Sequence, residues 1–219
     1  MYLTRFRMNP KLRGTVRLVS SAHRMHAMVL GAFPPDKTQS PEGRVLWRLD
    51  TPSRYDWTLF IVSPARPSME RFQSMCGWSQ EPSWQTADYG PFLDRLATGQ
   101  RWAFRLTANP VRTVAREHGQ RGKVLPHVTA EQQKGWLLER SSRYGFTLSD
   151  AHLEVTRRER DSFSRGSREH GRATATISRA QFDGVLEVVD PEVLRTSLTY
   201  GIGRAKAYGC GLMTLARSA

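Results

Sequence analysis

The chain has 219 residues, and its 33 Lys and Arg against 20 Asp and Glu give a formal net charge of +13. That length allows one large domain or two of about 100 residues. The 39% hydrophobic fraction argues against disorder over the whole length, and no apolar run approaches the ~20 residues of a membrane span. Two cysteines cannot build a disulfide framework or a zinc site, and arginines interrupt any N-terminal signal core, so a cytoplasmic location is expected.

The first part of the chain predicts the element order β-α-β-β-α-β. Residues 2–8 alternate in character, which is typical of a strand, and one side of that strand is basic. The helical pattern of residues 15–33 is shortened if Ser20 or Ser21 is an N-cap. The predicted elements are a strand at 2–8, a helix at 15–33, strands at 45–49 and 56–62, a helix at 68–76 with Ser68 as N-cap, and a strand at 84–89.

The same order recurs after a connector at 91–100. Thr129 and Gln132 form a capping box, and Asp190 before Pro191 marks another helix start. The predicted elements are a strand at 101–107, a helix at 129–144 with Gly145 as C-cap, strands at 152–158 and 174–189, a helix from 191, and a strand at 212–216.

These patterns predict an α+β fold of two tandem ferredoxin-like (RRM-like) βαββαβ domains. The predicted domains are residues 1–90 and residues 101–219. The repeat is one of element order, because no similarity of residues is visible between the two halves. Sheets of this kind commonly bind single-stranded RNA, but a fold does not by itself establish a function.

The positive charge is unevenly distributed. Residues 1–35 contain six basic residues, Arg24 among them, and no acidic one, and residues 101–172 contain 15 basic and 8 acidic residues. A GC-rich genome would explain why only 5 of the 33 basic residues are Lys, but it would not explain the shortage of carboxylates. Clustered positive charge favours a polyanion partner, because binding releases condensed counterions.

A glycine loop at residues 201–211 contains four glycines, including Gly201 and Gly203. It lacks the dinucleotide fingerprint, because Lys206 stands where the third glycine belongs, and it lacks the Gly-Lys-Ser/Thr of a P-loop. Two interpretations remain open: a loop whose backbone approaches a phosphate near Arg204 and Lys206, or a tight turn that packs the last strand under a helix.

Two histidines and one arginine cluster are further candidates for function. His23 and His26 share a helix face and could act as acid and base near neutral pH, or simply lie half-buried at the edge of that face. Arg157, Arg158 and Arg160 begin a basic hairpin tip at 160–172 that continues with Arg165, Arg168 and Arg172. Such a hairpin could contact an RNA helix, or be a solvated loop.

The chain resembles the CasE-type CRISPR-associated endoribonucleases of type I-E systems. The residues that carry the resemblance run from end to end in the same order: Met-Tyr-Leu-Thr at 1–4, Met25-His26, Phe-Arg-Leu-Thr-Ala-Asn-Pro at 104–110, Phe-Asp-Gly-Val-Leu-Glu-Val-Val-Asp at 182–190, and the glycine loop with the following strand at 201–216. The family has tandem ferredoxin-like domains, in agreement with the element order.

The resemblance implies cleavage of CRISPR precursor RNA at the 3′ base of the repeat hairpin, without a metal or other cofactor. The upstream 2′-hydroxyl attacks the scissile phosphate and leaves a 2′,3′-cyclic phosphate and a 5′-hydroxyl. His26 matches the family's catalytic histidine. The product stays bound, and the expected partners are the crRNA hairpin and the other subunits of the Cascade complex.

This sequence departs from the family at two positions. The first is His23, which stands where some relatives have tyrosine. Because an imidazole can act as acid or base near neutral pH, we hypothesise that His23 and His26 form an acid/base pair. The second is Arg204, which stands where relatives often have proline. The residues of this chain that are predicted to contact RNA are Lys206, Arg204, Gly201, Gly203, Arg157, Arg158, Arg160 and Arg24. The alternative is a non-catalytic subunit that only binds an RNA hairpin.

Overall fold

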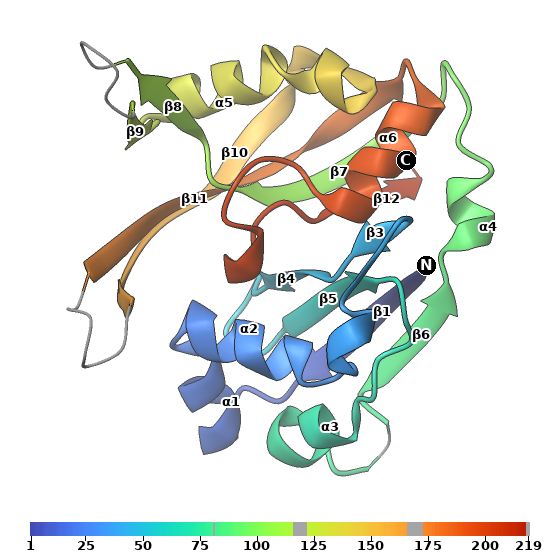
Figure 1. Cartoon of the computed structure of the whole chain (residues 1–219), viewed down its shortest axis with the longest axis vertical. Coiled ribbons are helices and arrows are strands. Elements are labelled where there is room, and N and C mark those ends of the chain that lie inside the picture. The colour runs from blue at the N-terminus through green and yellow to red at the C-terminus, as the bar shows by residue number, and fades with distance from the viewer. Residues whose placement is uncertain (81, 116–121, 166–172, 218–219) are drawn as a thin grey trace.

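The computed structural model describes residues 1–80, 82–115, 122–165 and 173–217. Within these residues the chain forms two four-stranded antiparallel sheets, each carrying helices on one face (Figure 1). The strands of the first sheet are β1 (Tyr2–Met8), β4 (Leu46–Asp50), β5 (Trp57–Ser63) and β6 (Trp84–Asp88). The strands of the second are β7 (Arg101–Ala108), β10 (Phe146–Arg165), β11 (Ala173–Val188) and β12 (Met213–Arg217).

Both sheets have the strand order of a ferredoxin-like domain. In each, the first strand of its domain lies at the centre, between the third and the fourth, giving β4-β5-β1-β6 and β10-β11-β7-β12. The helices are α1 (Arg13–Val19), α2 (Ala22–Leu30), α3 (Glu70–Cys76), α4 (Gly90–Leu93), α5 (Ala130–Leu138) and α6 (Pro191–Tyr200). The predicted fold class is confirmed.

Of two local helix predictions, the alternative of a cap at Ser21 is confirmed and the cap at Ser68 is wrong. The pattern at 15–33 forms two helices, α1 and α2, because Ser21 caps the second: its side chain accepts a hydrogen bond from the backbone N–H of Arg24 at 3.4 Å. Ser68 does not cap α3, whose N-cap is Met69; the Ser68 hydroxyl bonds instead to the Glu70 carboxylate.

In the second domain the predicted caps are confirmed. Thr129 and Gln132 form the capping box of α5, and the Asp190 carboxylate accepts from two backbone N–H groups of α6. The pattern at 129–144 ends as a helix at Leu138 and continues as a 3-10 turn, η2 (Ser141–Tyr144), before Gly145.

Several short elements were not predicted. Two small hairpins lie outside the main sheets, one of β2 (Gln39–Ser40) with β3 (Gly43–Arg44) and one of β8 (Val111–Val114) with β9 (Lys123–Pro126). Two further 3-10 turns are η1 (Pro35–Lys37) and η3 (Lys206–Tyr208). Hairpins this short carry too little periodic pattern to be recognised in a sequence.

The basic hairpin is longer and more regular than its sequence suggested. Strand pairing between β10 and β11 continues as far as Arg165 opposite Ala173, so Arg160, predicted to begin the tip, is paired with Ser178 inside the ladder. We call residues 157–165 and 173–181 the arm; it extends away from the body of the second domain (Figure 1). Arg168 and Arg172 lie outside the described residues.

Hydrophobic packing explains why one face of the first sheet is covered. Phe6 and Met8 of β1 are at most 1% exposed and share a core with Met25 of α2 and Phe72 of α3. Arg5 and Arg7 alternate to the opposite face, where they line a separate pocket with Arg105. The positive charge of the N-terminal strand therefore lies on the side of the sheet away from His26.

The two domains are joined by a buried, fully hydrogen-bonded arginine. Arg48 of β4 is 1% exposed, and its guanidinium donates to both carboxylate oxygens of Asp50 at 2.7 and 2.9 Å. It also donates across the junction, to the backbone carbonyls of Arg105 (2.7 Å) and Leu212 (3.2 Å) and to the Thr214 hydroxyl (2.9 Å). Because buried charge is tolerated only with such partners, this network fixes how the domains meet.

Candidate functional site

The glycine loop of the second domain comes down onto α2 of the first. The loop begins at the end of α6, and its 3-10 turn η3 contacts α2. Four of its glycines have φ between +77° and +92°, the left-handed region that favours glycine. A Cβ on Gly209 would lie 2.7 Å from the Trp47 ring, and one on Gly203 would lie 3.2 Å from the Trp136 ring.

These contacts bear on the two interpretations of the loop. Gly201, Gly203 and Gly209 allow close packing against side chains of both domains, which supports a structural turn for the glycines themselves. Of the charged residues in the loop, Lys206 lies in the turn that contacts α2. Contact of Gly201 and Gly203 with RNA stays a prediction.

His26 lies where this loop meets α2. Its ring is half-buried and tilted by 48° to that of Tyr208, with 6.5 Å between ring centroids. Its Nδ1 atom is buried and has no hydrogen-bond partner among the described residues. Burial, then the positive charges of His23 and Arg44, lower the pKa of His26 below its usual 6.5, so this imidazole is neutral at pH 7.

Lys206 is held in the same region. Its ammonium donates to the carbonyl oxygen of Gly203 at 2.6 Å, which ties the lysine to its own loop. Burial and the positive charge of Arg44 lower its pKa. Arg44 lowers the pKa of both His26 and Lys206, so one positive charge acts on both side chains.

His23 and Arg24 occupy the first turn of α2, and both are exposed. His23 is near enough to His26 to lower its pKa, as their spacing on one helix face requires. Arg24 donates to the Ser20 hydroxyl at 3.0 Å and so closes the turn between α1 and α2. Arg204 is exposed in the glycine loop.

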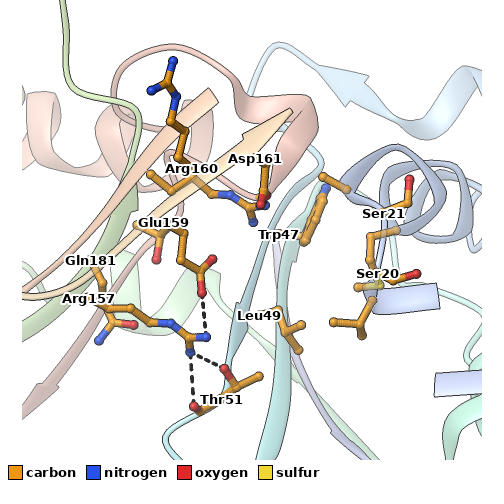
Figure 2. A pocket seen from close by; sticks show the side chains of 16 residues that line it. Ser20, Ser21, Trp47, Leu49, Thr51, Arg157, Glu159, Arg160, Asp161 and Gln181 are labelled. Carbon is orange, nitrogen blue, oxygen red and sulfur yellow. Dashed lines mark hydrogen bonds and ion pairs between the residues drawn. The ribbon is translucent and has the colours of Figure 1, made fainter. Parts of the chain in front are cut away.

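A pocket with a volume of about 510 Å³ lies between the arm, β4 and the start of α2. Figure 2 shows Ser20 and Ser21 on one side of this pocket and Arg157, Glu159 and Gln181 on the other. Trp47 and Leu49 of β4 lie between the two sides. The pocket therefore lies between the first turn of α2 and the base of the arm.

The arm arginines are not equivalent. Arg157 crosses to the first domain, where it donates to the backbone carbonyl of Thr51 at 3.2 Å and to its hydroxyl, and it pairs with Glu159 at 2.5 Å. Arg158 points the other way and donates to the Val128 carbonyl at 3.3 Å. Arg160 is exposed and lines the pocket. Arg157 and Arg158, which are neighbours on β10, thus contact different parts of the protein.

Sequence reasoning missed Arg44 and Arg179. Arg44 follows a polar loop and gave no periodic or motif signal; its position beside His26 and Lys206 depends on a hairpin of two-residue strands. Arg179 lies on β11 in the pocket lining and pairs with Asp161 across the arm. In the described part of the chain no helix is long and apolar enough to span a membrane, and no group of three or more His, Cys, Asp or Glu could hold a metal.

The fold and the site define a tandem ferredoxin-like protein with a histidine at the domain junction. A family model described as "CRISPR associated protein" matches residues 1–217. The chain is 31% identical over 239 residues to the CRISPR-associated endoribonuclease Cse3 of Thermus thermophilus, covering 99% of this chain and 100% of the relative. The chain therefore belongs to the CRISPR-associated protein family that includes Cse3.

Two further comparisons agree with this membership. The Cascade subunit CasE of Escherichia coli K12 is 30% identical over 129 residues, which are 56% of this chain and 61% of the relative. A structure of the endoribonuclease Cse3 bound to a 19-nucleotide RNA superposes with a TM-score of 0.78 at 25% identity, covering 98% of each chain.

Proposed function

We propose that this chain is an endoribonuclease that cleaves CRISPR precursor RNA at the 3′ base of the repeat hairpin. One observation carries the proposal: a half-buried, neutral histidine lies where the glycine loop meets α2, near Arg44 and the turn that bears Lys206. A base beside positive charge is the arrangement needed to deprotonate a hydroxyl next to a phosphodiester. The named activity of Cse3 and the RNA bound in its structure support the substrate class.

In the proposed reaction neutral His26 takes the proton of the 2′-hydroxyl upstream of the scissile phosphate. The 2′-oxygen bonds to phosphorus, the bond to the 5′-oxygen breaks, and protonated His23 gives its proton to that oxygen. The products are a 2′,3′-cyclic phosphate and a 5′-hydroxyl, and no metal takes part. The depressed pKa of His26 supports its role as the base, because a base must be unprotonated at the working pH.

The RNA stem is proposed to lie along the arm. Arg160, Arg158 and Arg157 would contact its backbone or groove, and Arg204, Lys206 and Arg24 would contact phosphates near the cleavage site. Because E. coli CasE is named a Cascade subunit, we further propose that the product stays bound and enters such a complex in the cytoplasm. The two units at residues 1–90 and 101–219 would each supply part of the RNA surface.

Incubation of the protein with a repeat hairpin in EDTA tests the proposal. A single cut with a cyclic-phosphate end is expected, and His26→Ala should abolish the cut while leaving the Kd for the hairpin within about threefold. His23→Ala tests the acid role: a rate within a few-fold of the unsubstituted chain would exclude it. Tight binding without any cut by the unsubstituted chain would instead favour the non-catalytic hairpin-binding subunit.

A further inference from the structure

Arg44 is a half-buried arginine at the junction of the two domains. It lies on β3, whose short hairpin with β2 pairs Arg44 with Gln39. The Tyr200 hydroxyl at the end of α6 donates to the carbonyl oxygens of Ser40 (3.1 Å) and Pro41 (2.7 Å) in the turn of this hairpin. Tyr200 immediately precedes the glycine loop, so the hairpin that bears Arg44 is tied to the base of that loop.

Close packing keeps the hairpin at this place. A Cβ on Gly43 would lie 2.9 Å from both the Cβ and the carbonyl oxygen of Thr199, so the backbone beside Arg44 is in direct contact with α6. The nearby Glu42 pairs with the N-terminal ammonium at 4.0 Å. Arg44 itself forms no ion pair with a carboxylate in the described part of the chain.

Arg44 is therefore half-buried and has no carboxylate partner in the described part of the chain. Its Nε atom is buried and lacks a hydrogen-bond partner among residues 1–80, 82–115, 122–165 and 173–217. A buried donor left unpaired costs free energy, more so when it is charged. The charge of Arg44 acts on both His26 and Lys206, so Arg44 lies near the proposed base and near the loop cation. An anion bound there would be attracted to both Arg44 and Lys206.

We propose that Arg44 contacts the scissile phosphate and stabilises the transition state of RNA cleavage. This inference rests on the proposed function, because that reaction supplies the anion. Attack by the deprotonated 2′-oxygen raises the charge on the phosphoryl group from −1 towards −2. A fixed guanidinium that gains attraction as this charge develops binds the transition state more tightly than the substrate, and so raises the rate more than the affinity.

The test is single-turnover cleavage of the repeat hairpin at saturating enzyme, with the Kd measured on a hairpin that carries 2′-deoxy at the cleavage site. Arg44→Ala should slow cleavage by about 10²–10³-fold, as loss of one transition-state donor does, and change the Kd less than about fivefold. Arg44→Lys keeps a charge and should recover part of the rate. Arg66→Ala removes an exposed arginine and should change neither quantity.

The possible outcomes separate this inference from the proposed function. If the unsubstituted chain does not cut the hairpin in EDTA, both are overturned. If the unsubstituted chain cuts, the role of Arg44 alone is overturned by either of two results. One is a cleavage rate of Arg44→Ala within threefold of the unsubstituted chain, and the other is a loss of affinity without a loss of rate. Should Arg44→Ala fail to fold in a thermal melt, Arg44→Gln and Arg44→Lys decide: equal rates for the two would rule out a contribution from the charge.

Discussion

Arg48→Met tests whether the buried arginine holds the two domains together. The change keeps an apolar chain of similar length but removes the guanidinium. The Asp50 side chain, 7% exposed, is then left with Arg105 at 3.5 Å as its remaining ion pair, and the carbonyls of Arg105 and Leu212 each lose a donor. Breaking a buried ion pair in this way costs about 3–5 kcal/mol of unfolding free energy.

Thermal denaturation followed by circular dichroism measures this loss. At roughly 2–4 °C per kcal/mol for a chain of this size, the Tm should fall by about 6–20 °C. Arg66→Met, at an exposed position, should stay within about 0.5 kcal/mol of the unsubstituted chain. The double variant Arg48→Met/Asp50→Asn should be more stable than the sum of the single changes predicts, since it leaves no unpaired buried charge. A Tm for Arg48→Met within 2 °C of the unsubstituted value, or strict additivity in the double variant, would refute the reasoning.

Four other predictions concern the site and the glycine loop. The single-turnover rate should rise with pH through the pKa of His26, which burial lowers from its usual 6.5, and should fall again at higher pH because the reaction also needs an acid; a profile without a basic limb would contradict the acid role. Arg160→Glu should raise the Kd for the hairpin and lower its salt dependence by about one counterion, as filter binding from 50 to 200 mM salt can measure. Gly209→Ala should lower the Tm, because φ is +77° and the new Cβ would meet Trp47, whereas Gly135→Ala in open space on α5 should raise stability by up to about 1 kcal/mol. Burial raises the pKa of the Cys210 thiol to about 12, so iodoacetamide at pH 8 should label it only after unfolding, as mass spectrometry would show.

Patterns within short stretches of sequence predicted much of each domain. The alternation at β1 matches the observed strand residue for residue, and the capping residues Thr129 and Asp190 mark the starts of α5 and α6. The reason is that a cap or an alternating strand depends on neighbours a few residues away. Where such signals competed, the sequence was less decisive: Ser68 could serve as a cap but bonds to Glu70, and only the structure selects Ser21 over Ser20 as the cap that divides the helical pattern at 15–33.

The sequence by itself determined the element order, the fold class, His23 and His26 as candidate acid or base residues, and the excess of positive charge, because each is written in residue type and local spacing. Only the tertiary structure decided which charges share the site. Arg5 and Arg7 lie across the sheet from His26, whereas Arg44, which no motif marks, comes to lie beside it. The buried Arg48 likewise finds its partners at Leu212 and Thr214, more than 160 residues further along the chain. Contacts of this range depend on how the two sheets pack, and no local pattern contains that information.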